Sequence, residues 1–169
     1  MKKFFIFFSA ILLVVADQVV KVLVVKNKFA LPKVIINGFL KFSYCENRGV
    51  AFSLGEGNIA LFIVLNILLI GFVIFYYEKN REKFNRLGEI CISLVVAGGA
   101  SNLIDRIFRG FVVDFIDVND FVNFAIFNVA DIFITVGVFG LAMYYLLMIN
   151  KELKVKNNEE KLLKESNNK

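Results

Sequence analysis

The chain has 169 residues, which suits a single domain, and apolar residues make up 58% of it, above the roughly 45–50% that is usual in soluble domains. The net charge is +5, but the basic residues gather in short segments between long apolar runs, which indicates membrane topology and anionic lipid rather than nucleic acid. No His is present, so His-based catalytic triads and most catalytic zinc sites are excluded.

The first apolar run follows Met1-Lys2-Lys3 and begins at Phe4. A basic start before an apolar run is also typical of a cleaved signal peptide. The apolar pattern, however, resumes after Asp17-Gln18 and continues to Val25, and no A-x-A site follows. We therefore interpret the run as an uncleaved transmembrane helix of about 20 residues.

Three further apolar spans cover residues 59–77, 87–104 and 124–149. Together the four spans predict an all-α membrane protein with four transmembrane helices, forming one domain over residues 1–150. The third span carries Gly98-Gly99-Ala100-Ser101, and such small residues let a neighbouring helix approach closely.

The connections between the spans differ in character. Residues 27–58 contain Pro32 and the alternating stretch Lys41-Phe42-Ser43-Tyr44, which predicts a small extracytoplasmic β-rich element between the first two helices. Residues 105–123 are expected to be part surface helix and part loop. Residues 151–169 are rich in Lys, Glu and Asn, and we expect a solvated or disordered basic tail in the cytoplasm.

The distribution of Lys and Arg predicts the orientation. With the N-terminus inside, the inner segments hold two, four and six basic residues, twelve altogether, and the outer connections hold five and two. The positive-inside rule therefore places both termini in the cytoplasm.

Polar residues of three spans and one connection fall at the same depth in this topology, toward the extracytoplasmic face. Ionisable residues inside a membrane are costly, and they are functional candidates by default. The spacings Asn102–Arg106 (i, i+4) and Asn128–Asp131 (i, i+3) let each pair point in one direction. The candidate site residues are Asp17, Asn102, Asp105, Arg106, Asp114, Asn128 and Asp131.

Several polar residues also have plainer structural interpretations. These are a helix pair of Asp17 with Lys21, a contact between helices at Asn66, an ion pair of Asp105 with its neighbour Arg106, and solvated loop positions for Asp117 and Asp120.

Asp114 and Asp131 are different, because each lies among apolar neighbours with no base beside it in the sequence. Two aspartates brought together in a low-dielectric pocket share one proton. The ionised carboxylate can then take a proton from water while the protonated one donates to a carbonyl oxygen or a leaving amine. This is the aspartic protease arrangement, which needs no metal, cofactor or covalent intermediate.

Five motifs in order resemble those of the bacterial lipoprotein signal peptidases (signal peptidase II), from about Phe4 to Ile149. They are Asp17-Gln18-Val19-Val20-Lys21, Asn47-Arg48-Gly49-Val50-Ala51-Phe52-Ser53, Asn102-Leu103-Ile104-Asp105-Arg106, Gly110-Phe111-Val112-Val113-Asp114-Phe115 and Phe127-Asn128-Val129-Ala130-Asp131. Two positions depart from the family pattern: Ser101 stands where Gly is frequent, and Val20 where Ser or Thr is common.

The resemblance implies that Asp114 and Asp131 are the catalytic dyad. It further implies that Asp17, Asn47, Asn102, Asp105, Arg106 and Asn128 bind substrate or support the site. The implied reaction removes the signal peptide from a prolipoprotein, N-terminal to a diacylglyceryl-modified cysteine, in the bacterial cytoplasmic membrane, and globomycin inhibits it. We expect a monomer whose partners are this substrate and membrane lipids.

Two other functions fit parts of the pattern. A small proton-coupled carrier would also use intramembrane carboxylates, but such sites tend to lie near the midplane, between repeats that this chain lacks. A Ser/Lys protease would use Ser101 or Ser9 as the nucleophile and Lys21 as the base.

Overall fold

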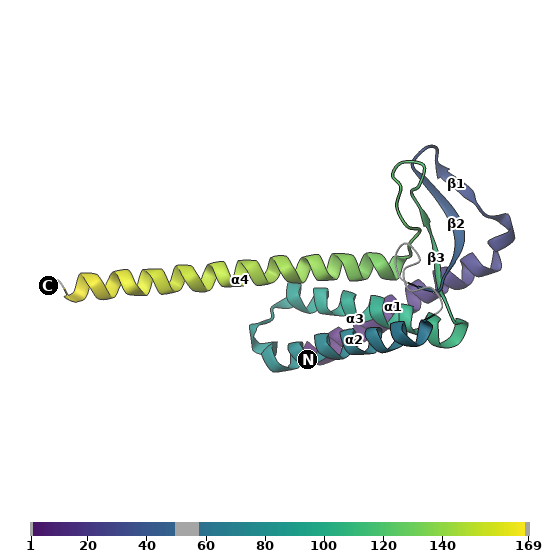
Figure 1. The fold of residues 1–169 in the computed structure, drawn as a ribbon. Coiled ribbons are helices and arrows are strands. Elements are labelled where there is room, and N and C mark those ends of the chain that lie inside the picture. Colours follow the sequence, from purple (N-terminus) through teal and green to yellow (C-terminus); the bar gives the residue numbers. More distant parts are fainter. Residues whose placement is uncertain (1, 50–57, 168–169) are drawn as a thin grey trace.

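The computed structural model describes the backbone of residues 2–49 and 58–167 (Figure 1). Four long helices carry a small sheet at one end of the bundle. Each helix contains a stretch long and apolar enough to cross a membrane, which confirms the prediction of four transmembrane helices. The helices are α1 (Lys2–Lys26), α2 (Ile59–Asn80), α3 (Arg86–Arg109) and α4 (Val129–Asn167), with the short 3₁₀ helices η1 (Lys28–Ala30) and η3 (Arg81–Lys83) between them.

Helix α3 is the centre of the bundle. Within its apolar stretch 67% of the residues are buried, against 6% in α2, because α1, α2 and α4 all pack on α3. The outer helices expose large apolar side chains, such as Phe72, Phe75 and Phe139. So much exposed apolar surface is unusual for a soluble protein, and it suits a chain surrounded by lipid.

Glycines bring α3 and α4 into backbone contact. A Cβ atom added at Gly98 would collide with the carbonyl oxygen of Ala130, and one added at Gly137 would lie 2.9 Å from that of Cys91. The predicted close approach of a neighbouring helix to the third span is therefore confirmed.

Three antiparallel strands form the sheet in the order β1 (Lys33–Ile36), β2 (Leu40–Asn47) and β3 (Val112–Asp117). The first two strands confirm the predicted β-rich element between the first two helices. The third corrects our expectation of part helix and part loop, because its mostly apolar and β-branched residues pair with β2 in a register that sets Asp114 opposite Cys45. Gly110 ends α3 in the left-handed conformation (φ 76°) and turns the chain into β3.

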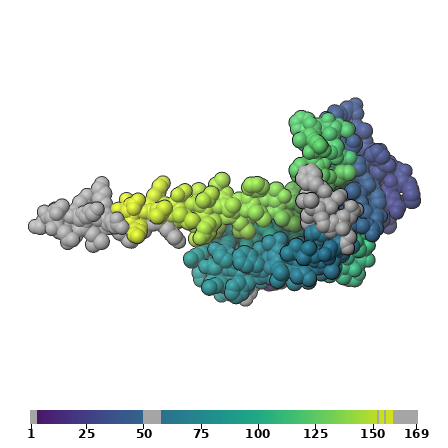
Figure 2. Space-filling model, in the orientation of Figure 1, coloured from purple at the N-terminus to yellow at the C-terminus, as the bar shows by residue number. Residues whose placement is uncertain are grey.

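Both ends of α4 differ from the sequence prediction. The helix begins at Val129 rather than at residue 124, since the preceding segment bonds to the sheet: the Ile116 amide donates to the Phe127 carbonyl at 2.8 Å. At the other end α4 continues as a helix through Asn167, beyond the apolar span that we ended at residue 149. The side chains described beyond Asn150 are exposed, and α4 projects far beyond the other helices (Figures 1 and 2).

Helix α1 belongs to the bundle, as its interpretation as a membrane span requires. Two charged side chains of α1, Asp17 and Lys21, are fully buried against α3 and the start of α4. Both lie in the half of the bundle that carries the sheet.

Candidate active site

Asp114 and Asp131 line the same cavity, which has a volume of about 540 Å³. Asp114 comes from the middle of β3 and Asp131 from the first turn of α4. Asn47, Asn66 and Arg106 also line this cavity, while its remaining wall consists mostly of apolar residues from the segment before α4 and from α4 itself. The structure thus brings the two candidate carboxylates to one hollow from separate elements.

Asn128 connects the two carboxylates and caps α4. Its side-chain amide donates to Asp114 Oδ1 at 2.6 Å. Its backbone amide donates to Asp131 Oδ2 at 3.1 Å, and the Asp131 amide donates back to Asn128 Oδ1 at 2.9 Å. This reciprocal pair is a capping box, so the same residues that start the helix also position both aspartates. The positive end of the helix dipole favours negative charge at Asp131.

Two further amides complete the hydrogen bonds of the aspartates. Asn102 on α3 donates to Asp131 Oδ1 at 2.8 Å, and Asn47 at the end of β2 donates to Asp114 Oδ2 at 2.8 Å. Each of the four carboxylate oxygens therefore accepts a hydrogen bond, and four separate elements supply the donors or the carboxylates. Such a network fixes the orientation of both groups.

A buried ionic layer lies behind the aspartates. The Lys21 ammonium forms ion pairs with Asp17 and Asp105, both at 2.9 Å, and all three side chains are fully buried. Asp17 accepts a hydrogen bond from the Ala130 amide at 3.0 Å, and Asp105 accepts one from the Val113 amide at 3.2 Å. Each carboxylate thus holds the residue immediately before one of the candidate catalytic aspartates.

Sequence reasoning underestimated Lys21, which we interpreted as the partner of Asp17 alone or as a catalytic base. The i, i+4 spacing indicated the pair with Asp17, but nothing in the sequence indicated the second pair with Asp105. Lys21 also donates to Asn102 Oδ1 at 3.0 Å, which ties the ionic layer to the amides around the aspartates.

Arg106 does not pair with its neighbour Asp105, as the plainer interpretation expected. Successive helical residues point in different directions. Asp105 pairs with Lys21 and Arg109, while Arg106 lines the cavity and donates to the Gly49 carbonyl at 3.1 Å. The sequence prediction of a shared ion pair is wrong, and Arg106 is left facing the cavity.

Asp117 is buried, whereas we expected a solvated loop residue. It accepts hydrogen bonds from Ser43 at 2.7 Å and from Asn119, because β3 extends to this position and pairs with β2. Asp120 is exposed as expected and forms an ion pair with Lys41 at 2.7 Å.

Asn66 was interpreted as a contact between helices. It lines the cavity, and within the described part of the chain its side-chain nitrogen is buried with no hydrogen-bond partner.

Burial and a neighbouring charge change the acidity of Asp114. Burial of the carboxyl group, followed by the charge of Asp131, raises the pKa of Asp114 from its ordinary value of 3.8 to about 7, against the opposing effect of the hydrogen bonds from Asn47 and Asn128. Asp114 therefore exchanges a proton near neutral pH, as a general acid or base should.

The arrangement does not suit a Ser/Lys protease. The Ser101 hydroxyl donates to Asp17 at 2.5 Å, and the Lys21 ammonium is held by two carboxylates. Ser9 bonds to Ser93 at 2.9 Å, near the opposite end of α3 from Asn102.

Among the described residues, no group of three or more His, Cys, Asp or Glu side chains is arranged to bind a metal ion. Residues 50–53, which belong to the second sequence motif, lie outside the described part of the chain.

Comparisons with known proteins agree on one family. A family model described as signal peptidase (SPase) II matches residues 9–147. A lipoprotein signal peptidase of Fusobacterium nucleatum subsp. nucleatum is 37% identical over 153 residues, covering 90% of this chain and 91% of that protein. One of Streptococcus thermophilus is 41% identical over 145 residues, covering 85% and 93%. A solved bacterial membrane enzyme aligns with a TM-score of 0.76 and 31% identity, over 83% of this chain and 87% of that chain.

Proposed function

The chain belongs to the signal peptidase II family, and from this premise we propose that it is an intramembrane aspartyl endopeptidase acting on diacylglyceryl-modified prolipoproteins. The coarser function, that of a lipoprotein signal peptidase and multi-pass membrane protease, follows from family membership and the four apolar helices. The observation that carries the finer proposal is the cavity lined by Asp114 and Asp131, with Asn128 bonded to both.

Peptide hydrolysis needs one ionised and one protonated aspartate. The ionised carboxylate takes a proton from water as the water oxygen attacks the scissile carbonyl carbon. The protonated carboxyl group donates to the carbonyl oxygen, which gives a neutral tetrahedral intermediate. The intermediate collapses when the aspartate protonated in the first step donates its proton to the amine nitrogen of the lipid-modified cysteine, the other carboxylate takes a proton from a hydroxyl group of the intermediate, and the C–N bond breaks. The pKa of about 7 at Asp114 supports a shared proton at neutral pH.

The walls of the cavity suit a substrate that is part peptide and part lipid. Asn47 and Arg106 are among its lining residues and carry N–H groups that can donate to peptide carbonyl groups. Phe124, Ile132 and Val136 also line it, and such apolar side chains can accommodate the diacyl chains while the peptide reaches the aspartates. We propose that the cut falls N-terminal to the lipid-modified cysteine and that globomycin, a cyclic peptide, inhibits by occupying this cavity.

The proposed topology places both termini in the cytoplasm and the sheet with the aspartates at the extracytoplasmic face. This side is where a lipid-anchored prolipoprotein presents its cleavage site. The enzyme is proposed to work as a monomer and without a cofactor, because the two carboxyl groups supply both proton transfers.

The test is cleavage of a diacylglyceryl-modified prolipoprotein by the purified protein, with and without globomycin. Asp114→Asn and Asp131→Asn should each lower the cleavage rate by a factor of at least about 10². This factor is the lower end of what general acid–base catalysis contributes. Asp120→Asn is the matched control, since Asp120 is exposed and paired with Lys41. Near wild-type cleavage by either dyad variant contradicts the proposal. Ion or solute flux through proteoliposomes that depends on Asp131 would support a carrier instead.

A further inference from the structure

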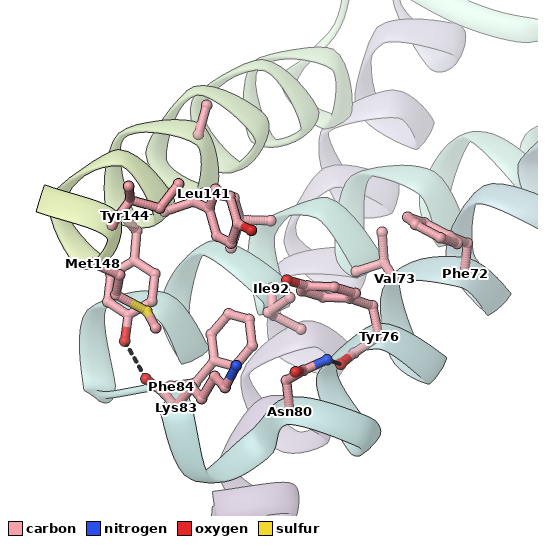
Figure 3. Close-up of a pocket in the computed structure, with 13 residues that line it drawn as sticks. Phe72, Val73, Tyr76, Asn80, Lys83, Phe84, Ile92, Leu141, Tyr144 and Met148 are labelled. Atoms are coloured by element: carbon pink, nitrogen blue, oxygen red, sulfur yellow. Dashed lines mark hydrogen bonds between the residues drawn. The ribbon is translucent and has the colours of Figure 1, made fainter. Parts of the chain in front are cut away.

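A second cavity, of about 470 Å³, lies at the end of the bundle opposite the aspartates. Figure 3 shows the residues that line it. Its walls come from the last turns of α2 and the middle of α4, and Ile92 of α3 forms part of its base. The volume falls within the range of small-molecule sites. Its lining residues on α2 and the turn after it are Phe72, Val73, Tyr76, Asn80, Lys83 and Phe84.

The cavity is apolar over most of its length and polar at one end. Aromatic rings and aliphatic side chains such as Val73, Leu141 and Met148 line the apolar part. Asn80 and Lys83 mark the polar end, where α2 passes into η3. A ligand with a long apolar body and a charged head matches this division.

Hydrogen bonds hold the backbone at the polar end of the cavity in place. The Tyr144 hydroxyl donates to the Lys83 carbonyl at 2.6 Å and accepts from the Asn85 amide at 3.0 Å, so α4 fixes the turn that carries Lys83 (Figure 3). The Asn80 side-chain amide donates to the Tyr76 carbonyl at 3.0 Å. The backbone around Lys83 is thereby held in place beside the cavity.

The charge at this end is positive and only partly compensated. Arg81 pairs with Glu82 at 3.5 Å and Arg86 with Glu89 at 3.3 Å. Lys83 has no ion pair within residues 2–49 and 58–167, and its side chain is exposed at the rim. The ammonium group is therefore available to an anion at the end of the apolar cavity.

The tyrosines indicate the depth of the cavity in the bilayer. Tyr76, Tyr144 and Tyr145 all line it, and tyrosine is enriched where hydrocarbon meets the headgroups. On the proposed topology this end faces the cytoplasm, where anionic lipids concentrate and attract basic residues.

We propose that this cavity binds one anionic phospholipid, with an acyl chain between α2 and α4 and the phosphate beside Lys83. A zwitterionic lipid of the same chain length fills the apolar part equally well and also carries a phosphate, but its own cation offsets the attraction to Lys83, so the net charge of the headgroup sets the preference. The site is separate from the candidate aspartates, and lipid binding does not depend on proteolysis.

The test is native mass spectrometry of the purified protein titrated with dioleoyl phosphatidylglycerol or dioleoyl phosphatidylcholine. The wild type should bind the first lipid more tightly. Lys83→Gln should raise its Kd about fivefold, which corresponds to about 1 kcal/mol for one basic residue near anionic lipid. Lys83→Arg should retain the preference. The matched control is Lys26→Gln, because Lys26 is an exposed lysine at the end of α1 that leads to the sheet.

A second variant tests the cavity itself and leaves Lys83 unchanged. Ala142→Trp fills the space beside α4 and should weaken binding of both lipids, whereas Ala60→Trp, on the exposed surface of α2 away from the cavity, should not. Asp114→Asn should bind phosphatidylglycerol like the wild type, whether or not the proposed protease mechanism holds. Equal affinity of the wild type for the two lipids, or an unchanged Kd in Lys83→Gln, overturns the proposal.

Discussion

The two cavities of this protein are similar in size and both have mostly apolar walls, but they differ in the polar groups that they hold. The one near the sheet measures about 540 Å³ and holds Asp114 and Asp131, while the one at the other end measures about 470 Å³ and is lined mainly by aromatic and aliphatic side chains. Volume alone does not distinguish a reacting site from a binding site. The distinguishing feature is a pair of carboxyl groups taken out of water and held by amides.

The two ends of the bundle are also held together differently. Near the sheet, buried ions and amides connect α1, α3, β3 and α4. At the other end, Phe84 stacks on Tyr144 with ring centroids 5.6 Å apart and lies 5.5 Å from Tyr77. We therefore expect substitutions near the sheet to change both activity and stability, and those at the aromatic end to change stability alone.

The largest effect on stability is expected at Lys21. Lys21→Met leaves Asp17 and Asp105 buried without their shared cation, and removing one partner of a buried ion pair typically costs about 3–5 kcal/mol. Thermal unfolding in detergent measures the loss, and prolipoprotein cleavage should fall with it. Lys26→Met, an exposed position on the same helix, serves as the control. Full stability in Lys21→Met would mean that the ionic layer does not support the fold.

Gly98→Ala should come next. The added methyl group collides with the Ala130 carbonyl, so the start of α4 must move, and with it Asp131. Overpacking of this kind costs about 1–3 kcal/mol, and the rate should fall further than the stability loss explains. Gly71→Ala is the control, because nothing lies within 4 Å of the added carbon. Equal rates for the two variants would show that helix separation does not control the dyad.

A smaller loss, confined to stability, is expected at the aromatic end. Tyr144→Phe leaves the Asn85 amide and the Lys83 carbonyl without their shared hydroxyl, at a cost of about 1–2 kcal/mol. The cleavage rate per folded molecule should remain that of the wild type. Tyr145→Phe, at a half-exposed position, should change neither property. A fall in rate comparable with that of Gly98→Ala would erase the distinction between the two ends.

The remaining prediction concerns the dependence of stability on pH. Because the pKa of Asp114 is about 7 in the folded protein and near 4 in the unfolded chain, the folded state binds more protons between these values and loses stability as the pH rises. The slope is at most about 1.4 kcal/mol per pH unit. Asp114→Asn lacks this titration, so its melting temperature relative to the wild type should increase between pH 4.5 and pH 7.5. Parallel melting curves would contradict the raised pKa of Asp114.

Much of this architecture could be predicted from the sequence, because membrane spans and intramembrane carboxylates carry strong local signals. The four apolar runs predicted the four helices. The apolar surroundings of Asp114 and Asp131 marked both as candidates, and the structure places both in one cavity. The i, i+3 spacing of Asn128 and Asp131 predicted that the two side chains lie on one face. In the structure these two residues form the capping box at the start of α4.

The rest depended on contacts between distant segments, which local patterns do not contain. Residues 112–117 became a strand only because β2 was available to pair with them, and this pairing also buried Asp117. The ion pair of Lys21 with Asp105 and its hydrogen bond to Asn102 join α1 to α3 across more than eighty positions of the chain. The burial of the Asn66 amide nitrogen, which has no hydrogen-bond partner among the described residues, likewise follows from packing that its apolar neighbours in the sequence do not reveal.

The capping box at Asn128 has a consequence for how the protein responds to heat. Helix ends fray at temperatures well below global melting. Here the first turn of α4 is also the turn that orients both aspartates, so opening that single turn disconnects the carboxyl groups while the four helices stay assembled. Warming should therefore abolish prolipoprotein cleavage reversibly at temperatures where circular dichroism still reports an intact helical protein.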